Sequence, residues 1–148
     1  MYKFKTEPYQ HQKDALTKCW NKTSFAIFAE MGTGKTKIAL DNACILYNKG
    51  KIDRLLVVAP KGAYMNWVDL EIPVHVPDYI EKKVLGWKPS TSAKYQAQLK
   101  DMLKLNDYRL KIMVMNVEAF STKKGLDFAK LALPLKIHKL KEQKPCCL

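Results

Sequence analysis

One short segment of this chain combines the residue types that can hold a triphosphate. Residues 29–36 read AEMGTGKT. Gly32 and Gly34 allow a tight turn, so that several backbone N–H groups can converge on a phosphate at a helix N-terminus. Lys35 can reach the β- and γ-phosphates, and the Thr36 hydroxyl can ligate Mg²⁺. The spacing therefore predicts a phosphate-binding loop.

The context of this loop favours a nucleoside triphosphate site over a glycine-rich turn with a solvated lysine. Residues 24–29 have the apolar pattern of a strand, and residues 34–48 follow the period of a helix. The full pattern has Gly at its first position, where this chain has Ala29. Lys35 and Thr36 are the predicted catalytic residues, and Thr36 is also the predicted metal residue, through Mg²⁺ on the nucleotide. The loop residues predicted to bind the cofactor are Met31, Gly32, Thr33, Gly34, Lys35 and Thr36.

The composition fits one basic domain. The chain has 148 residues, of which 47% are hydrophobic, and its formal net charge is +12. Such a charge makes a polyanion a plausible partner, because Lys and Arg bind phosphates by releasing counterions. No run approaches 18 apolar residues and the N-terminus has no apolar core, so we expect a cytoplasmic protein without a membrane segment. Its cysteines should be reduced thiols rather than metal ligands.

The elements that must position the loop alternate along the chain. Helical patterns cover residues 12–20, 34–48, 64–71, 91–106 and 127–133, and strand patterns cover residues 24–29, 54–59, 83–85 and 110–117. Strands that alternate with helices at this spacing indicate a parallel α/β sheet.

Four blocks then stand in order: residues 8–16 (PYQHQKDAL), the loop, residues 55–61 (LLVVAPK) and residues 113–120 (MVMNVEAF). Together they resemble the first motor domain of a superfamily 2 helicase, and most closely that of the Swi/Snf-type DNA translocases. The resemblance covers residues 8–130. It implies an α/β fold of RecA-like type, a P-loop parallel sheet with helices on both faces. It also implies ATP and Mg²⁺ as cofactors and DNA as the partner.

The resemblance assigns roles outside the loop. In that family a glutamine, followed after two residues by a small residue and Leu, reads adenine; Gln12 has this spacing to Ala15 and Leu16, and Gln10 is the competing candidate. A glutamine amide offers one acceptor and one donor face, which suits the adenine edge. The third block is similar to a motif that contacts the DNA backbone, which implies that Lys61 lies near a phosphate. The turn after the fourth block implies a nucleic-acid contact at Asn116.

One family motif has no counterpart. The Asp-Glu pair that holds Mg²⁺ and activates water in the family occurs nowhere in this chain. We therefore expect the ATP-binding part of a helicase or translocase, inactive or weak in hydrolysis alone. The alternatives are a non-catalytic nucleotide- or DNA-binding module that acts by self-association, and a remnant that binds no ligand.

The end of the chain suggests a reason for this gap. Residues 1–132 form the partial helicase domain, and residues 133–148 form a basic tail that matches nothing in the family. Read in a shifted frame, the tail resembles the segment that follows the acidic motif, which suggests a frameshift and hence an incomplete, truncated first helicase domain. Loss of later strands would leave a sheet edge unpaired, so we expect the tail to dock as a replacement strand near residues 133–137, or the chain to form a homo-oligomer.

Overall fold

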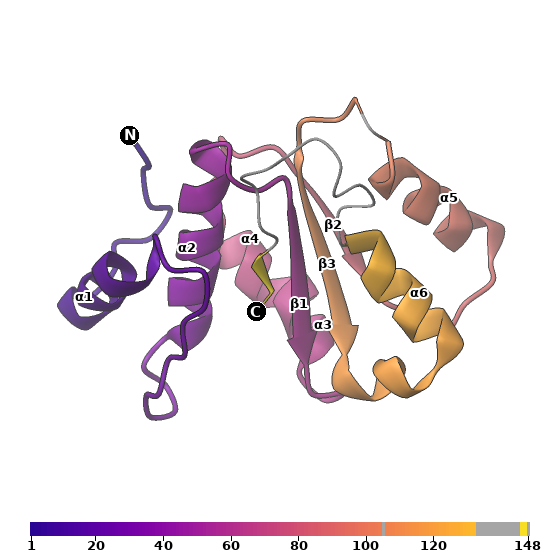
Figure 1. Cartoon of the computed structure of the whole chain (residues 1–148), viewed down its shortest axis with the longest axis horizontal. Coiled ribbons are helices and arrows are strands. Elements are labelled where there is room, and N and C mark those ends of the chain that lie inside the picture. Colours follow the sequence, from indigo (N-terminus) through magenta and orange to yellow (C-terminus); the bar gives the residue numbers. More distant parts are fainter. Residues whose placement is uncertain (105, 133–145, 148) are drawn as a thin grey trace.

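The computed structural model describes residues 1–104, 106–132 and 146–147. Its centre is a parallel sheet with the strand order β2-β3-β1-β4. The strands are β1 (Arg54–Ala59), β2 (Lys82–Gly86), β3 (Leu110–Asn116) and β4 (Cys146–Cys147). The predicted parallel α/β fold is confirmed (Figure 1).

Helices cover both faces of this sheet, as the RecA-like interpretation requires. The helices are α1 (Gln10–Cys19), α2 (Lys35–Asn48), α3 (Tyr64–Asn66), a π-helical segment η1 (Trp67–Glu71), α4 (Ile72–His75), α5 (Ala93–Met102), a 3-10 turn η2 (Val117–Ser121) and α6 (Lys123–Ala132). Helices α2 and α4 lie on one face and α5 and α6 on the other, while α1 lies outside α2 (Figure 1). Within the described residues, no helix combines the length and apolar character that a membrane span needs.

Two hydrophobic cores follow from the alternation of side chains along the strands. All seven residues of β3 are buried. Ile112 faces the first core, where it joins Leu55 of β1 and Leu40 of α2. Met113, its neighbour in sequence, faces the second core with Phe128 of α6. Strand β3 is therefore covered on both sides, which explains its nearly continuous apolar sequence.

The strand predicted at residues 24–29 is wrong. This segment has no regular secondary structure, and Phe28 and Phe25 are 94% and 47% exposed. A strand is stable only when its backbone groups pair with a neighbour. Here β1 is flanked by β3 and β4, and the described residues supply no strand next to residues 24–29. The apolar pattern of residues 24–29 therefore does not form a strand in the described part of the chain.

The end of the tail contributes the short strand β4 to the sheet. Cys146 and Cys147 pair in parallel with Leu55 and Leu56 of β1. The replacement strand expected near residues 133–137 lies outside the described residues. The remaining boundaries shift by a few residues: α5 is shorter than predicted, α6 begins earlier, and the helix predicted to end at residue 71 continues through α4.

Candidate functional site

The predicted phosphate loop adopts the backbone conformation that its glycines allow. Gly32 and Gly34 have φ angles of 79° and 77°, in the left-handed region that favours glycine. A Cβ on Gly32 would meet nothing within 4 Å, so the loop is open at that residue. Gly34 is the N-cap of α2, and Lys35 and Thr36 form the first turn of that helix. The turn and the helix start are thus placed as the sequence predicted, although no strand precedes them.

The amine of Lys35 folds back on the loop. It donates hydrogen bonds to the carbonyl oxygens of Ala29 at 2.7 Å and Glu30 at 2.8 Å. The Thr33 hydroxyl also donates to the Glu30 carbonyl, at 2.8 Å. The Lys35 ammonium is thus bound to two carbonyl oxygens, and phosphate oxygens could take their place. A cation of this kind suits the negative charge of a triphosphate. Met31 is 96% exposed, so only its backbone can serve a phosphate.

The Gln12 side chain packs against the phosphate loop. This side chain is buried, its Oε1 accepts from the Tyr9 N–H at 2.9 Å, and its Nε2 donates to the Thr33 carbonyl at 3.3 Å. The His11 Nε2 lies 3.0 Å from the same carbonyl and acts as a second donor to it. Gln10, the competing candidate, is exposed and donates to Asp14 at 2.9 Å. The first motif block thus contacts the phosphate loop at Thr33, which lies 21 residues after Gln12 and 22 residues after His11.

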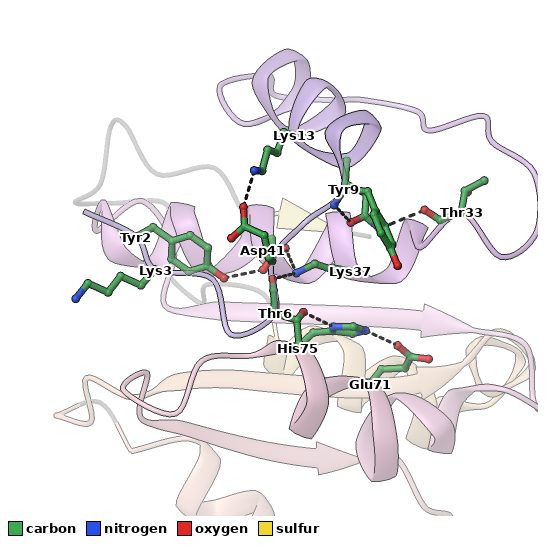
Figure 2. A network of polar contacts seen from close by, with 12 residues as sticks. Tyr2, Lys3, Thr6, Tyr9, Lys13, Thr33, Lys37, Asp41, Glu71 and His75 are labelled. Atoms are coloured by element: carbon green, nitrogen blue, oxygen red, sulfur yellow. Dashed lines mark hydrogen bonds and ion pairs between the residues drawn. The ribbon is translucent and has the colours of Figure 1, made fainter.

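A buried ion pair on α2 connects this helix to the N-terminal segment. Lys37 Nζ lies 2.8 Å from Asp41 Oδ2, and the two side chains are 7% and 0% exposed. The N-terminal segment covers them: the Tyr2 hydroxyl donates to Asp41 at 2.8 Å, and Lys37 donates to the Thr6 carbonyl at 2.8 Å (Figure 2). Sequence reasoning missed this network. Its signal was an opposite-charge pair four residues apart, which is usually a solvated helix face.

Two groups beside the Lys37–Asp41 pair, the Tyr2 phenol and the Cys44 thiol, stay uncharged near neutral pH. Burial, with Cys44 and Asp41 nearby, raises the pKa of the Tyr2 phenol far above its usual range. Burial also raises the pKa of the Cys44 thiol to about 12. A thiol is nucleophilic only as thiolate, so Cys44 is a packing residue, as its apolar neighbours indicate.

The residues predicted to contact DNA lie at the carboxyl ends of neighbouring strands. Ala59 of β1 is in register with Asn116 of β3, and Lys61 follows β1 by two residues. Lys61 is exposed. Asn116 is only 6% exposed, and its Oδ1 accepts from the Ala119 N–H at 3.1 Å, which caps η2. The lysine is therefore free to meet a polyanion, whereas the asparagine side chain shapes the turn.

The described residues offer few side chains that could ligate a metal ion directly. Over residues 1–104 and 106–132, no three side chains of the types His, Cys, Asp and Glu gather where they could hold a metal ion. Thr36, in the first turn of α2, is the residue that could ligate Mg²⁺ carried by a nucleotide.

A comparison with known protein families identifies the family of this chain. The model of the family described as type III restriction enzyme, res subunit, matches residues 5–144. The chain belongs to this family. Its members have superfamily 2 helicase-like motor domains of RecA-like fold, which typically use ATP with Mg²⁺. The match includes the loop, all four motif blocks and most of residues 133–148. No curated protein matches the chain significantly.

Proposed function

We propose that this chain is the ATP-binding part of a superfamily 2 DNA helicase or translocase, with weak or no hydrolysis by itself. The observation that carries the proposal is the loop: two glycines with positive φ lead into α2, and the Lys35 amine rests on two carbonyl oxygens. A helix N-terminus behind a glycine-rich turn favours anions through its free N–H groups and its dipole.

Each loop residue has a stated part in binding. The Lys35 amine exchanges the Ala29 and Glu30 carbonyls for oxygens of the β- and γ-phosphates. The backbone N–H groups of residues 32–36 bind the β-phosphate, and the Thr36 hydroxyl ligates Mg²⁺ on the nucleotide. The bound ATP would supply the phosphoryl group whose transfer drives a complete motor. Without an Asp-Glu pair in the sequence, weak turnover is the expected behaviour of this chain.

DNA is the proposed polyanion. The net charge of +12 supplies non-specific attraction, and exposed Lys61 supplies a contact at the carboxyl edge of the sheet. The start of α2 and the carboxyl ends of β1 and β3 lie at the same end of the molecule (Figure 1). ATP and DNA would therefore bind at one end of the domain. The four motif blocks support the finer assignment to the Swi/Snf type.

Calorimetric titration with Mg-ATP tests the proposal. We expect saturable binding that Lys35→Ala reduces at least about tenfold, because a charge-assisted contact to phosphate is lost. Lys61→Ala is the matched control: it should leave ATP binding unchanged and weaken binding to duplex DNA. If the unmodified chain gives no heat with Mg-ATP and no salt-dependent affinity for DNA, the chain is a remnant without ligand.

A second candidate function is self-association, and one observation favours it. Phe28, on the segment that has no strand partner, and Met31, in the loop that follows it, are 94% and 96% exposed. Exposed apolar side chains on an unpaired extended segment can pair with another copy. Light scattering should then show a mass that rises with concentration and falls in Phe28→Ser. A monomer at every concentration would contradict this candidate.

A further inference from the structure

A hollow opens at the amino ends of the strands, and its volume is about 1020 Å³. Its lining comes mainly from the last turn of α2 and from the residues directly ahead of β2 and β3. Tyr47, Tyr79 and Tyr108 supply three aromatic rings to this lining. The phosphate loop leads into the first turn of α2, and Lys61 follows the carboxyl end of β1. The hollow therefore lies at the opposite end of the sheet from both predicted binding sites.

Hydrogen bonds hold the part of the wall formed by residues 107–109. The Asp107 carboxylate accepts from the Arg109 Nε at 2.9 Å and from its Nη2 at 3.0 Å. The Tyr47 hydroxyl donates to the Tyr108 carbonyl at 2.7 Å. These bonds leave the Tyr108 side chain 90% exposed. They use two of the five N–H donors of the Arg109 guanidinium, so donors remain for an anion. The wall thus presents an exposed aromatic ring next to a cation.

The end of α2 extends this surface with two more cations and another ring. The amines of Lys49 and Lys51 lie 4.4 Å and 6.0 Å from the centroid of the Trp20 ring. The helix ends in a glycine turn: Gly50 has a φ of 66°, and the Lys51 N–H returns to the Leu46 carbonyl at 2.9 Å. Neither lysine takes part in an ion pair with another described residue. This turn therefore presents two uncompensated cations beside the hollow.

The lining of the hollow, together with Trp20, Lys49 and Lys51, forms what we call the amino-end surface, and its charge is positive. Four cations and two carboxylates belong to it: Lys49, Lys51, Lys104, Arg109, Glu81 and Asp107. Flanking ion pairs add one cation, Lys83, and one carboxylate, Asp101. The surplus of two positive charges therefore remains when these pairs are included. A positive surface with exposed aromatic rings fits a flexible polyanion that carries rings of its own.

We propose that the amino-end surface binds single-stranded nucleic acid, with bases stacked on the exposed rings of Tyr79 and Tyr108. The phosphates lie against Arg109 and against the two lysines over Trp20. Stacking combined with phosphate contacts binds single strands with little dependence on sequence, because every base has a π-face. A duplex keeps its bases inside its own stack and cannot use these rings. This site is separate from the proposed ATP site and from the carboxyl edge of the sheet, and it does not depend on either.

Fluorescence anisotropy with a labelled oligothymidylate of about twelve nucleotides, in the absence of ATP, tests the proposal. Tyr108→Ala should weaken binding of the single strand about tenfold and leave binding of a duplex unchanged, because only the stacking contribution is lost. Tyr108→Phe keeps the ring and should bind as the unmodified chain does. Lys49→Ala should lower the slope of log affinity against log salt by about 0.7, because one phosphate contact is lost. Lys94→Ala, at an exposed position of α5, is the charge-matched control and should leave that slope unchanged.

Three results would overturn this proposal. One is equal affinity of Tyr108→Ala and the unmodified chain for the single strand. Another is loss of binding in Lys61→Ala with none in Tyr108→Ala, which would locate the strand at the carboxyl edge of the sheet. The third is no binding of the oligothymidylate by the unmodified chain. The ATP titration is independent of all three results, so this inference and the proposed function can fail separately. Because the Tyr108 side chain is exposed, its substitution should leave the circular dichroism and the urea midpoint of the chain unchanged.

Discussion

Strand β3 and residues 25–28, which lie just ahead of the phosphate loop, are both apolar runs, but only β3 forms a strand. Strand β3 is buried at all seven of its positions, whereas the apolar residues 25–28 ahead of the loop form no strand and include Phe28 at 94% exposure. Strand β3 lies between β1 and β2 and is covered on both faces. The comparison teaches that an apolar run becomes a strand only where neighbouring strands can pair with it.

Helix α2 is the element that belongs to both regions. Leu40 and Cys44 pack in the first sheet core, while the first turn of the helix carries the loop. Ile38, on another side of the helix, packs against Leu16 of α1. The loop keeps its shape because the helix behind it is anchored on two sides. Three predictions test this division of roles, beginning with the residue that joins the two regions.

Removal of the buried carboxylate under the loop should have the largest effect. Asp41→Ala leaves the Lys37 amine without its buried partner and removes the acceptor of the Tyr2 hydroxyl. We expect the free energy of unfolding to fall by about 3–5 kcal/mol, since an uncompensated buried charge is costly. Urea unfolding measures this. The control is Asp78→Ala, at the solvent-exposed Lys5–Asp78 pair, which should change the free energy of unfolding far less than Asp41→Ala does. Equal effects of the two variants would show that Asp41 is not the anchor.

Truncation of an apolar side chain should distinguish the two regions directly. Ile112→Ala leaves a cavity in the first core and should lower the free energy of unfolding by about 2–5 kcal/mol. Phe28→Ala removes a larger side chain but should change stability by less than about 0.5 kcal/mol, because Phe28 is already exposed. Urea midpoints of the two variants give the comparison. A large loss in Phe28→Ala would mean that residues 24–29 pair as a strand in solution.

Lowering the pH should destabilise the protein through Asp101 and Asp107, by less than either of the substitutions Asp41→Ala and Ile112→Ala. Hydrogen bonds from Lys83 and Lys104 lower the pKa of the Asp101 carboxyl to about 2, and Arg109 and Lys83 lower the pKa of Asp107. A carboxyl pKa below its unfolded value, about 3.9, adds stability that is complete above that value. This stability is lost as the pH falls through the folded pKa.

Thermal unfolding between pH 5 and pH 2 measures that loss. Lys83→Met removes a partner of both carboxylates, so its melting temperature should fall less steeply over this range than that of the unmodified chain. Lys94→Met, at an exposed position of α5, is the control. Parallel curves for Lys83→Met and the unmodified chain would contradict the assignment.

The sequence predicted those features that depend on neighbours along the chain. The aliphatic run of β3, the period of α2 and the two glycines of the loop specify their local structure directly. The strand at residues 24–29 failed because pairing depends on distant segments. The adenine-reading role of Gln12 stays a prediction, and its partner in the structure, the Thr33 carbonyl, is 21 residues away in sequence. Motif spacing identified an important residue but could not show which groups it faces.

The burial of the Lys37–Asp41 pair on α2 could not be predicted from the sequence either. Lys37 and Asp41 lie one turn apart, which suggests a solvated ion pair. They are buried because Tyr2 and Thr6 lie over them, and nothing in the helix sequence announces that cover. A helix pattern predicts which residues share a face, and only the fold decides whether another segment covers that face.

Residues 21–26, ahead of the phosphate loop, form an exposed stretch at which the polypeptide could be cut. Residues 21–26 are exposed and have no regular structure, whereas contacts with α2 hold the chain before them, from Tyr2 to Leu16. Such stretches tolerate nicking and rearranged termini. A chain opened there would yield two fragments that recognise each other through α1 and α2. The domain thus offers a split point at which reassembly of the halves would restore the phosphate loop.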